Sequence, residues 1–164
     1  MNYTVRNAAM QDLDRIEEIY EYAREFMRKT GNPNQWGTTN PPHAWLVDDI
    51  EKQLLHVIED EQGIHGVFYF YIGDDPTYGS IEDGAWHYNG TYGTIHRIAS
   101  DGSGGILRTA VSFCAALSDH IRIDTHHYNI VMQNAGARLG FKRSGIIHLA
   151  NGSPRIAYEL AVRK

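Results

Sequence analysis

Apolar residues recur along the chain with two different spacings, which predict its helices and strands. Between residues 11 and 30 they return every three or four positions, as in a helix with one buried face. The positions expected to face the core are Leu13, Ile16, Ile19, Tyr20, Ala23, Phe26 and Met27. Further helices are expected at residues 47–54, at 129–139, and between a glycine-rich turn at 101–105 and Leu117, with Leu107, Ala110, Val111, Cys114 and Leu117 inward.

Short apolar runs between turn residues predict the strands. They are expected at residues 3–6, 55–59, 64–72, 94–99, 120–125, 141–149 and 155–162. The turn at 60–63 joins one antiparallel hairpin, and Asn151-Gly152, a favoured two-residue turn, joins the last two strands. The helix after the strand at 94–99 implies a parallel connection to the next strand. The expected fold is α/β (α+β), a mixed, mostly antiparallel sheet with a central parallel β-α-β crossover, flanked by helices.

Two polar segments are too rich in aromatic residues or proline to be flexible linkers. Residues 31–45 hold three of the five prolines and Trp36, which is interpreted as a buried anchor or as one wall of a pocket. Asn34 and Gln35 beside it are candidate substrate-recognition groups. Residues 73–93 form a candidate substrate lid that includes Trp86 as a substrate-binding residue, and its acidic side chains would attract a cationic amine.

Composition narrows the classes of function. The chain has 164 residues, a formal net charge of -5 and scattered lysine and arginine, so the basic surface of a nucleic-acid-binding protein is absent. No apolar run reaches the roughly 20 residues of a membrane-spanning helix. A single cysteine, Cys114, and the lack of a recognisable signal peptide favour the cytoplasm. We expect one domain over residues 1–164, with no nucleic-acid or membrane partner, and the exposed aromatic residues are compatible with a homodimer.

The stretch from 95 to 117 has the order strand, glycine-rich turn, helix. Glycines let the main chain approach a ligand closely, and a helix N-terminus carries unpaired N–H groups and partial positive charge. Gly102, Gly104 and Gly105 therefore indicate a phosphate site. The same glycines also suit an ordinary crossover connection, and both interpretations stay open on this stretch alone.

Three segments together resemble the GNAT superfamily of N-acetyltransferases over nearly the whole chain. They are the strand IHRIAS, the turn DGSGG, and NIVMQNAGARLGF at residues 129–141. Gly105 matches the first glycine of that family's coenzyme A cradle, Asn129 matches its helix-heading asparagine, and Gly140-Phe141 matches the closing pair. The resemblance implies direct acetyl transfer from acetyl-CoA to a primary amine of a small molecule or peptide. It implies coenzyme contacts at Ile98, Ala99, Ser103, Gly104, Gly105, Ile106, Leu107, Arg108 and Asn129.

Three positions depart from the family pattern. Gly102 stands where the cradle usually has arginine or glutamine, and Leu107 stands where it usually has a second glycine or alanine. Gly136 replaces the tyrosine that many members use to protonate the thiolate, so that role is not carried over. These departures keep open a non-catalytic module of the same fold that binds or senses acyl-CoA. A nucleotide-binding interaction domain using the same glycine turn is a second alternative.

His96 and Ile98 are the candidates for the chemistry on the strand at 94–99. His96 lies where relatives often carry a glutamate, and an imidazole suits proton transfer near neutral pH better than a carboxylate does. The alternative is a histidine hydrogen-bonded within the sheet. The backbone N–H near Ile98 would stabilise the oxyanion of the transition state.

The sequence DTHHYN after the strand at 120–125 supplies further candidates. If the strand extends through it, Asp124 and His126 share one face, with His126 as a base or proton relay and Asp124 as a ligand of the substrate ammonium group. A zinc site is a weaker interpretation because no third ligand lies at a recognisable spacing. We therefore expect no metal.

Overall fold

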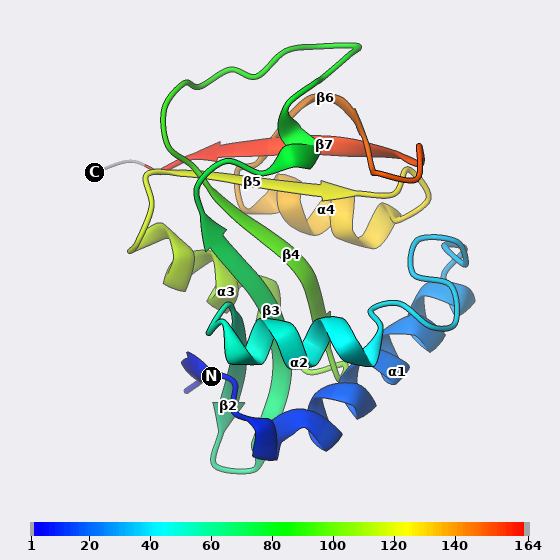
Figure 1. The fold of residues 1–164 in the computed structure, drawn as a ribbon, viewed down its shortest axis with the longest axis vertical. Coiled ribbons are helices and arrows are strands. Elements are labelled where there is room, and N and C mark those ends of the chain that lie inside the picture. Colours follow the sequence, from blue (N-terminus) through cyan, green and yellow to red (C-terminus); the bar gives the residue numbers. More distant parts are fainter. Residues whose placement is uncertain (1, 163–164) are drawn as a thin grey trace. The chain divides into compact units, whose positions relative to one another are not determined.

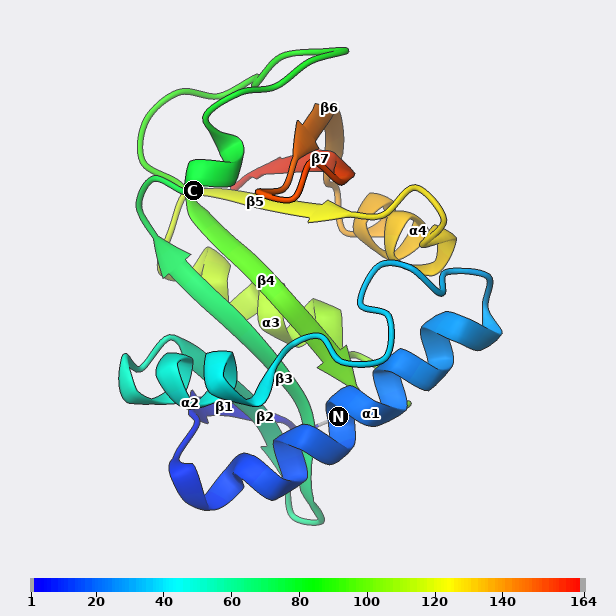
Figure 2. The same cartoon turned by 45° about the vertical axis from the view of Figure 1, so that its right-hand side comes forward.

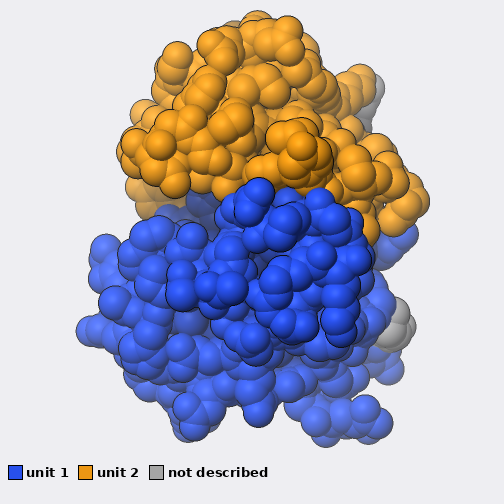
Figure 3. Space-filling view, turned by 90° about the vertical axis from the view of Figure 1, so that its right-hand side faces the viewer, with its two compact units in different colours: residues 1–70, 96–113 blue, residues 71–95, 114–164 orange. Residues whose placement is uncertain are grey.

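Residues 2–162 are described in the computed structural model of the chain, and they form two compact units (Figure 3). Within that range the first unit comprises residues 2–70 and 96–113, and the second comprises residues 71–95 and 114–162. Each unit contains strands packed against helices or ordered loops (Figure 1).

The elements follow one another in the predicted order. The strands are β1 (Thr4–Asn7), β2 (Leu55–Asp60), β3 (Gly63–Ile72), β4 (Gly93–Ser100), β5 (His120–Thr125), β6 (Lys142–His148) and β7 (Pro154–Ala161). The helices are α1 (Leu13–Lys29), α2 (His43–Glu51), α3 (Ile106–Ala115) and α4 (Ile130–Arg138), with 3-10 turns η1 (Met10–Asp12) and η2 (Pro76–Tyr78). The sheet order is β1-β2-β3-β4-β5-β7-β6, and β4 pairs with β5 in parallel. The predicted fold class is confirmed.

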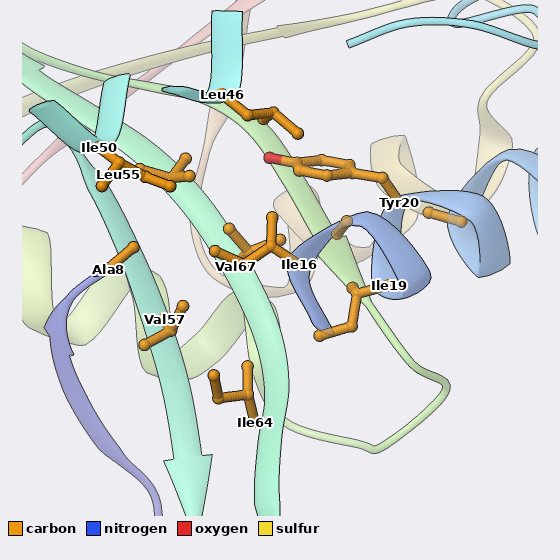
Figure 4. Packing of buried hydrophobic residues seen from close by; sticks show 12 residues of the cluster. Ala8, Ile16, Ile19, Tyr20, Leu46, Ile50, Leu55, Val57, Ile64 and Val67 are labelled. Carbon is orange, nitrogen blue, oxygen red and sulfur yellow. The ribbon is translucent and has the colours of Figure 1, made fainter. Parts of the chain in front are cut away.

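Helices α1 and α2 cover one face of the first unit's strands (Figure 2). Ile16, Ile19 and Tyr20 of α1 are buried against Leu55 and Val67 of β2 and β3 (Figure 4). Phe26 was expected on this face but is 42% exposed. Its direction differs by only about 20° from that of the buried Ile19, so its exposure follows from its place in the last turn of α1 and not from its angle around the helix.

Helix α3 packs on the opposite face of β2 and β3. The ring of Phe113 lies against the rings of His56 and Phe68, while Ile106 packs over Gly66. Cys114 is buried as predicted, and burial raises the pKa of its thiol, which keeps it unreactive. The expectation for Leu117 was wrong, because α3 ends at Ala115 and leaves Leu117 55% exposed.

Helix α2 begins four residues before its predicted start at 47. The carbonyl of Pro42 accepts the N–H groups of Trp45 at 3.0 Å and Leu46 at 3.3 Å, so the helix starts at His43. Proline is well tolerated where a helix begins, since its missing N–H has no intrahelical partner there. The sequence pattern predicts a loop over residues 31–45, so the first three residues of α2 fall within that predicted loop.

The segment from 73 to 93 belongs partly to the core of the second unit. The sequence predicts a substrate lid here, yet Tyr78 and Tyr92 are buried with Ile147 and Ala157. Glu82 pairs with Ile146 on β6 through two backbone hydrogen bonds of 2.9 and 2.7 Å. The aromatic rings supply the apolar surface that the rest of the segment lacks.

The connection between β6 and β7 differs from the predicted two-residue turn. The N–H of Leu149 donates to the carbonyl of Ser153 at 2.9 Å, and the N–H of Gly152 donates to the carbonyl of Leu149 at 2.8 Å. Gly152 has φ +86°, so the loop has three residues and ends on a left-handed glycine. The antiparallel pairing of β6 and β7 is confirmed.

Candidate functional site

The glycine turn of the first unit leaves the head of α3 exposed. Gly102 and Gly105 have φ of +97° and +80°, a region that favours glycine. The carbonyl of Gly105 accepts both the N–H of Thr109 at 3.0 Å and its hydroxyl at 2.7 Å, which places Gly105 at the helix start. The first N–H groups of a helix have no intrahelical acceptor, so this end of α3 suits an anion.

The turn itself is fixed by side chains. Asp101 Oδ1 accepts the N–H of Ser103 at 3.0 Å, and Ser100 Oγ accepts the N–H of Gly102 at 2.9 Å. The hydroxyl of Tyr3 donates to the carbonyl of Gly104 at 2.9 Å. Ser103 is one of the predicted coenzyme contacts, but its backbone N–H already donates to Asp101 within the turn. The other predicted backbone contacts of the turn begin at Gly104.

The side chains that follow differ in exposure. Ile106 is buried, Leu107 is half-buried and Arg108 is exposed. At Gly102 an added Cβ would lie 2.7 Å from the hydroxyl oxygen of Tyr22. The family's arginine or glutamine would therefore need Tyr22 to move.

Strand β4 has an unusual backbone conformation at Arg97, between the predicted catalytic residues His96 and Ile98. Arg97 has φ +52°, a left-handed conformation that is unusual for a non-glycine residue. Its carbonyl accepts the hydroxyl of Tyr20 at 2.7 Å, and its guanidinium donates to Asp49 Oδ2 at 2.6 Å and lies 4.6 Å from the ring centroid of Tyr69. These contacts compensate for the backbone strain. No sequence pattern predicts this cluster, because the φ angle and the partners of Arg97 are set by tertiary packing.

His96 and Ile98 flank Arg97, and both are half-buried. The ring centroid of His96 lies 5.7 Å from that of Tyr69. Ala99 is buried in the core. His96 and Ile98 thus lie on β4, and the glycine turn follows directly after that strand. The catalytic roles of His96 and Ile98 stay predictions.

The loop at 31–45 holds Trp36 as an anchor. Its ring meets that of Tyr20 edge-on, with centroids 5.6 Å apart, and packs on the core of the first unit. Gln35 Oε1 accepts the side-chain amide of Asn32 at 2.9 Å, and Asn34 is exposed. Trp36 is half-buried and not fully buried as expected, but it packs on the core as an anchor. The recognition roles of Asn34 and Gln35 stay predictions.

In the second unit, β5 ends at Thr125, so strand alternation does not extend to His126. The condition for placing Asp124 and His126 on one face is not met. Asp124 Oδ2 accepts the hydroxyl of Tyr78 at 2.7 Å. His126 is buried, and its Nδ1 accepts the N–H of Tyr128 at 3.1 Å. Desolvation lowers the pKa of His126, and a neutral ring with this bond carries its proton on Nε2.

Helix α4 has the expected cap at Asn129. Its Oδ1 accepts the N–H of Met132 at 3.1 Å. At the other end of the helix, the N–H of Phe141 donates to the carbonyl of Gly136 at 3.1 Å, and the N–H of Gly140 donates to the carbonyl of Ala137 at 3.0 Å. These two hydrogen bonds form a Schellman motif. The family-like Gly140-Phe141 pair thus ends the helix.

Trp86 is held within the second unit. Its indole N–H donates to the carbonyl of Tyr78 at 3.1 Å. The guanidinium carbon of Arg122 lies 3.7 Å from the Trp86 ring centroid and 3.8 Å from that of Tyr92. Glu159 accepts the N–H groups of His87 at 2.7 Å and Tyr88 at 3.3 Å. The predicted lid at residues 73–93 is therefore held in place around Trp86 by these contacts. The role of Trp86 in substrate binding stays a prediction.

Two general features bear on function. Residues 2–162 contain no group of three or more His, Cys, Asp or Glu side chains arranged to hold a metal ion. Over the same residues, no helix has the length and apolar character needed to cross a membrane.

Solved structures resemble this chain over its length. A GNAT-family acetyltransferase from Streptococcus agalactiae is 28% identical, with a TM-score of 0.87 over 99% of this chain and 96% of that one. A GNAT-family acetyltransferase from Listeria monocytogenes is 20% identical, with a TM-score of 0.69 over 97% and 94%. The Salmonella typhimurium protein yncA, a candidate acetyltransferase solved with acetyl-CoA, is 14% identical, with a TM-score of 0.63 over 99% and 95%. No family model and no curated protein sequence matches the chain.

Proposed function

We propose that this chain, which has the fold of the GNAT-family acetyltransferases, is an acetyl-CoA-dependent N-acetyltransferase that acts on a primary amine of a small molecule or peptide. The expected resemblance to that family is confirmed by similarity over 99% of the chain. The observation that carries the proposal is the exposed glycine turn at the head of α3, directly after β4 in a chain of this fold.

The coenzyme fits the turn by its chemistry. Gly104 and Gly105 are exposed, and the amides from Gly104 to Arg108 would bind a pyrophosphate without a side-chain cation. Asn129 already caps α4, which is compatible with a further contact from its side-chain amide to the pantetheine arm. Acetyl-CoA, when bound, supplies the thioester whose carbonyl the amine attacks.

Activation of the amine is the first chemical requirement. A lysine-like amine with a pKa of ~10.4 is mostly protonated at pH 7, which costs roughly 4.6 kcal/mol. We assign the removal of this proton to His96 on β4, whose ring lies beside that of Tyr69 on β3. The N–H near Ile98 would stabilise the oxyanion, and one such donor typically contributes about 2.7 to 4 kcal/mol.

For the first unit by itself, acceptor recognition is assigned to Asn34 and Gln35, which adjoin the anchor Trp36. For the second unit by itself, it is assigned to Trp86 and Asp124. The acidic residues of the segment from 73 to 93 would favour a cationic acceptor, although Asp83 is already paired with Arg143 at 2.9 Å.

The test combines binding and turnover. Calorimetry with acetyl-CoA, ATP and NAD measures which ligand binds, and a thiol-release screen covers polyamines, amino acids, aminoglycosides and peptide N-termini. The proposal predicts binding of acetyl-CoA in preference to the nucleotides, and thiol release with at least one amine.

A non-catalytic module that binds or senses acyl-CoA is the second candidate. It is favoured by Leu107 in the cradle and by Gly136, where a Cβ would point toward Ile123 Cδ1 at 3.6 Å and Phe141 Cβ at 3.9 Å. Tight acetyl-CoA binding without thiol release across the amine panel would support this candidate and contradict catalysis.

Location and assembly are also part of the proposal. We assign the protein to the cytoplasm, since its single cysteine is buried and reduced. A homodimer is compatible with exposed Tyr71 and Leu117. Sedimentation equilibrium at several concentrations would decide between monomer and dimer.

A further inference from the structure

Both ring nitrogens of His65 lie against carboxylates in the first unit. Nε2 lies 2.7 Å from Asp60 Oδ1, and Nδ1 lies 2.8 Å from Asp101 Oδ2. A neutral imidazole donates through one nitrogen only, so His65 donates to both carboxylates only as the imidazolium. The side chain is 14% exposed, which shields this bridge from solvent.

Asp101 connects the bridge to the glycine turn. Its Oδ2 also accepts Arg15 Nη2 at 2.8 Å, and its Oδ1 accepts the N–H of Ser103 at 3.0 Å. The N–H of Asp101 donates to the carbonyl of His65 at 3.0 Å. The turn is therefore attached to β3 through both main chain and side chain.

We infer that His65 is a positioning residue for coenzyme binding, which acts by bridging Asp60 and Asp101 as a cation. This inference rests on the proposed function, because it assigns the glycine turn to the coenzyme pyrophosphate. The bridge fixes Asp101, and Asp101 fixes the Ser103 amide and with it the path of the turn. The imidazolium also offsets a carboxylate that would otherwise repel a phosphate anion.

The charges around His65 decide the direction of the pH dependence. The groups that face it are Asp60 at the end of β2, Asp101 in the turn, Ser103, whose hydroxyl oxygen lies 3.3 Å from Nδ1, and Tyr3, whose ring centroid is 6.1 Å away. Arg15 on α1 reaches the shared Asp101 and also pairs with the exposed Glu18 at 3.4 Å. Protonated His65 offsets one of the two carboxylates that it bridges, and Arg15 is shared between Asp101 and Glu18. Loss of the His65 proton therefore makes the surroundings of an anion-binding turn more negative by one charge.

The hydrogen bond with Asp101 raises the pKa of His65, desolvation lowers it, and the bond with Asp60 raises it again, with a net rise. Because the folded value is the higher one, the bridge is complete below the ordinary histidine pKa of about 6.5 and is lost as pH rises through the raised value. Coenzyme affinity should therefore be highest at low pH and should fall across the His65 titration.

The experiment measures the dissociation constant of coenzyme A by calorimetry between pH 6 and pH 9. The affinity of the wild-type protein for coenzyme A should fall about tenfold from pH 6 to pH 9. This change is equivalent to a rise of about one unit in the His65 pKa on binding. His65→Gln should bind weakly at every pH with a flat profile, and should raise KM for acetyl-CoA while kcat at saturation changes little. His43→Gln is the matched control, since His43 also pairs with a carboxylate, Glu17 at 3.0 Å, on the same unit.

An NMR titration of the His65 ring in wild type needs no variant, and its pKa should rise further when coenzyme A binds. Coenzyme A affinity that is independent of pH, or a wild-type dissociation constant in a folded His65→Gln variant, would overturn the inference and leave the proposed function intact. A wild-type protein that binds no coenzyme A at any pH would contradict the proposed function and the role of His65 with it.

Discussion

The buried carboxylate of Glu159 accepts hydrogen bonds from four groups of the second unit. It is fully buried and accepts Ser144 Oγ at 2.5 Å and His120 Nε2 at 2.9 Å, besides the two backbone N–H groups of His87 and Tyr88. Desolvation raises the pKa of Glu159, but these hydrogen bonds outweigh it and the net pKa is lowered. A buried carboxylate is tolerated here because it is fully bonded.

Glu159→Gln should therefore lower the free energy of unfolding by about 2 kcal/mol at pH 7, since a neutral amide cannot accept all of these bonds. The folded pKa is below the unfolded value of about 4.3, so the carboxylate's contribution is present above that value and is lost as pH falls through the folded one. Urea unfolding at pH 7 and at pH 3 should show the difference from wild type shrinking at low pH.

Glu51→Gln, at an exposed position on α2, is the control and should leave unfolding unchanged. An equal loss of stability at both pH values would contradict the assignment of an ionised Glu159.

Helix α3 is seated on β3 by a close approach at Gly66. A Cβ added there would lie 2.7 Å from Ile106 Cγ2 and 3.1 Å from its Cδ1. Ile106 is the first residue of α3, so any movement at this contact shifts the helix end that carries the glycine turn. The position of the turn therefore depends on the absence of a side chain on the neighbouring strand.

Gly66→Ala should destabilise the protein by about 1 to 3 kcal/mol, because it overpacks the contact with Ile106. In an Ile106→Ala background the same substitution should cost much less, since the Cγ2 and Cδ1 atoms are gone. A double-mutant cycle by urea unfolding measures the coupling. Additive effects of the two substitutions would contradict the packing assigned to this pair.

A glycine inside helix α4 and a glycine just after its C-terminal end have opposite requirements. Gly136 lies inside the helix with its nearest non-local atom 3.6 Å from an added Cβ, while Gly140 has φ +97° at the C-terminal cap. Gly136→Ala should stabilise the protein by about 0.5 to 1 kcal/mol, and Gly140→Ala should destabilise it by at least as much. Thermal unfolding of both variants checks the signs, and two shifts of the same sign would contradict the cap geometry.

Across the whole molecule, the features that sequence predicts best are those with local causes. The cap at Asn129 follows from residue type, and the parallel β4–β5 pair follows from the helix between them. The buried face of α1 follows from its periodicity. The predicted burial of Phe26 and Leu117 was wrong, because burial near the end of a helix depends on where the helix and its neighbouring elements end.

The candidate site could be predicted only in part. The glycine turn was readable because its residues adjoin one another. The bond from His65 to Asp101 joins residues 36 positions apart, and the bond from Tyr20 to Arg97 joins residues 77 apart. Such partners are set by strand and helix packing, so no pattern in the sequence points to them. The first unit carries His96 and the turn, whereas the second carries Asp124, His126 and Asn129.

Acetyl transfer with His96 as its base is the central claim, and thiol release at saturating acetyl-CoA tests it most directly. Wild type should release thiol with its acceptor amine. His96→Ala should release it at least about a hundredfold more slowly, as expected for loss of a general base. Calorimetry should show coenzyme A binding to the variant unchanged within about twofold, since the turn that holds the pyrophosphate keeps its own contacts. Release of thiol by His96→Ala at the wild-type rate, or no release by wild type with any amine of the panel, would contradict the account.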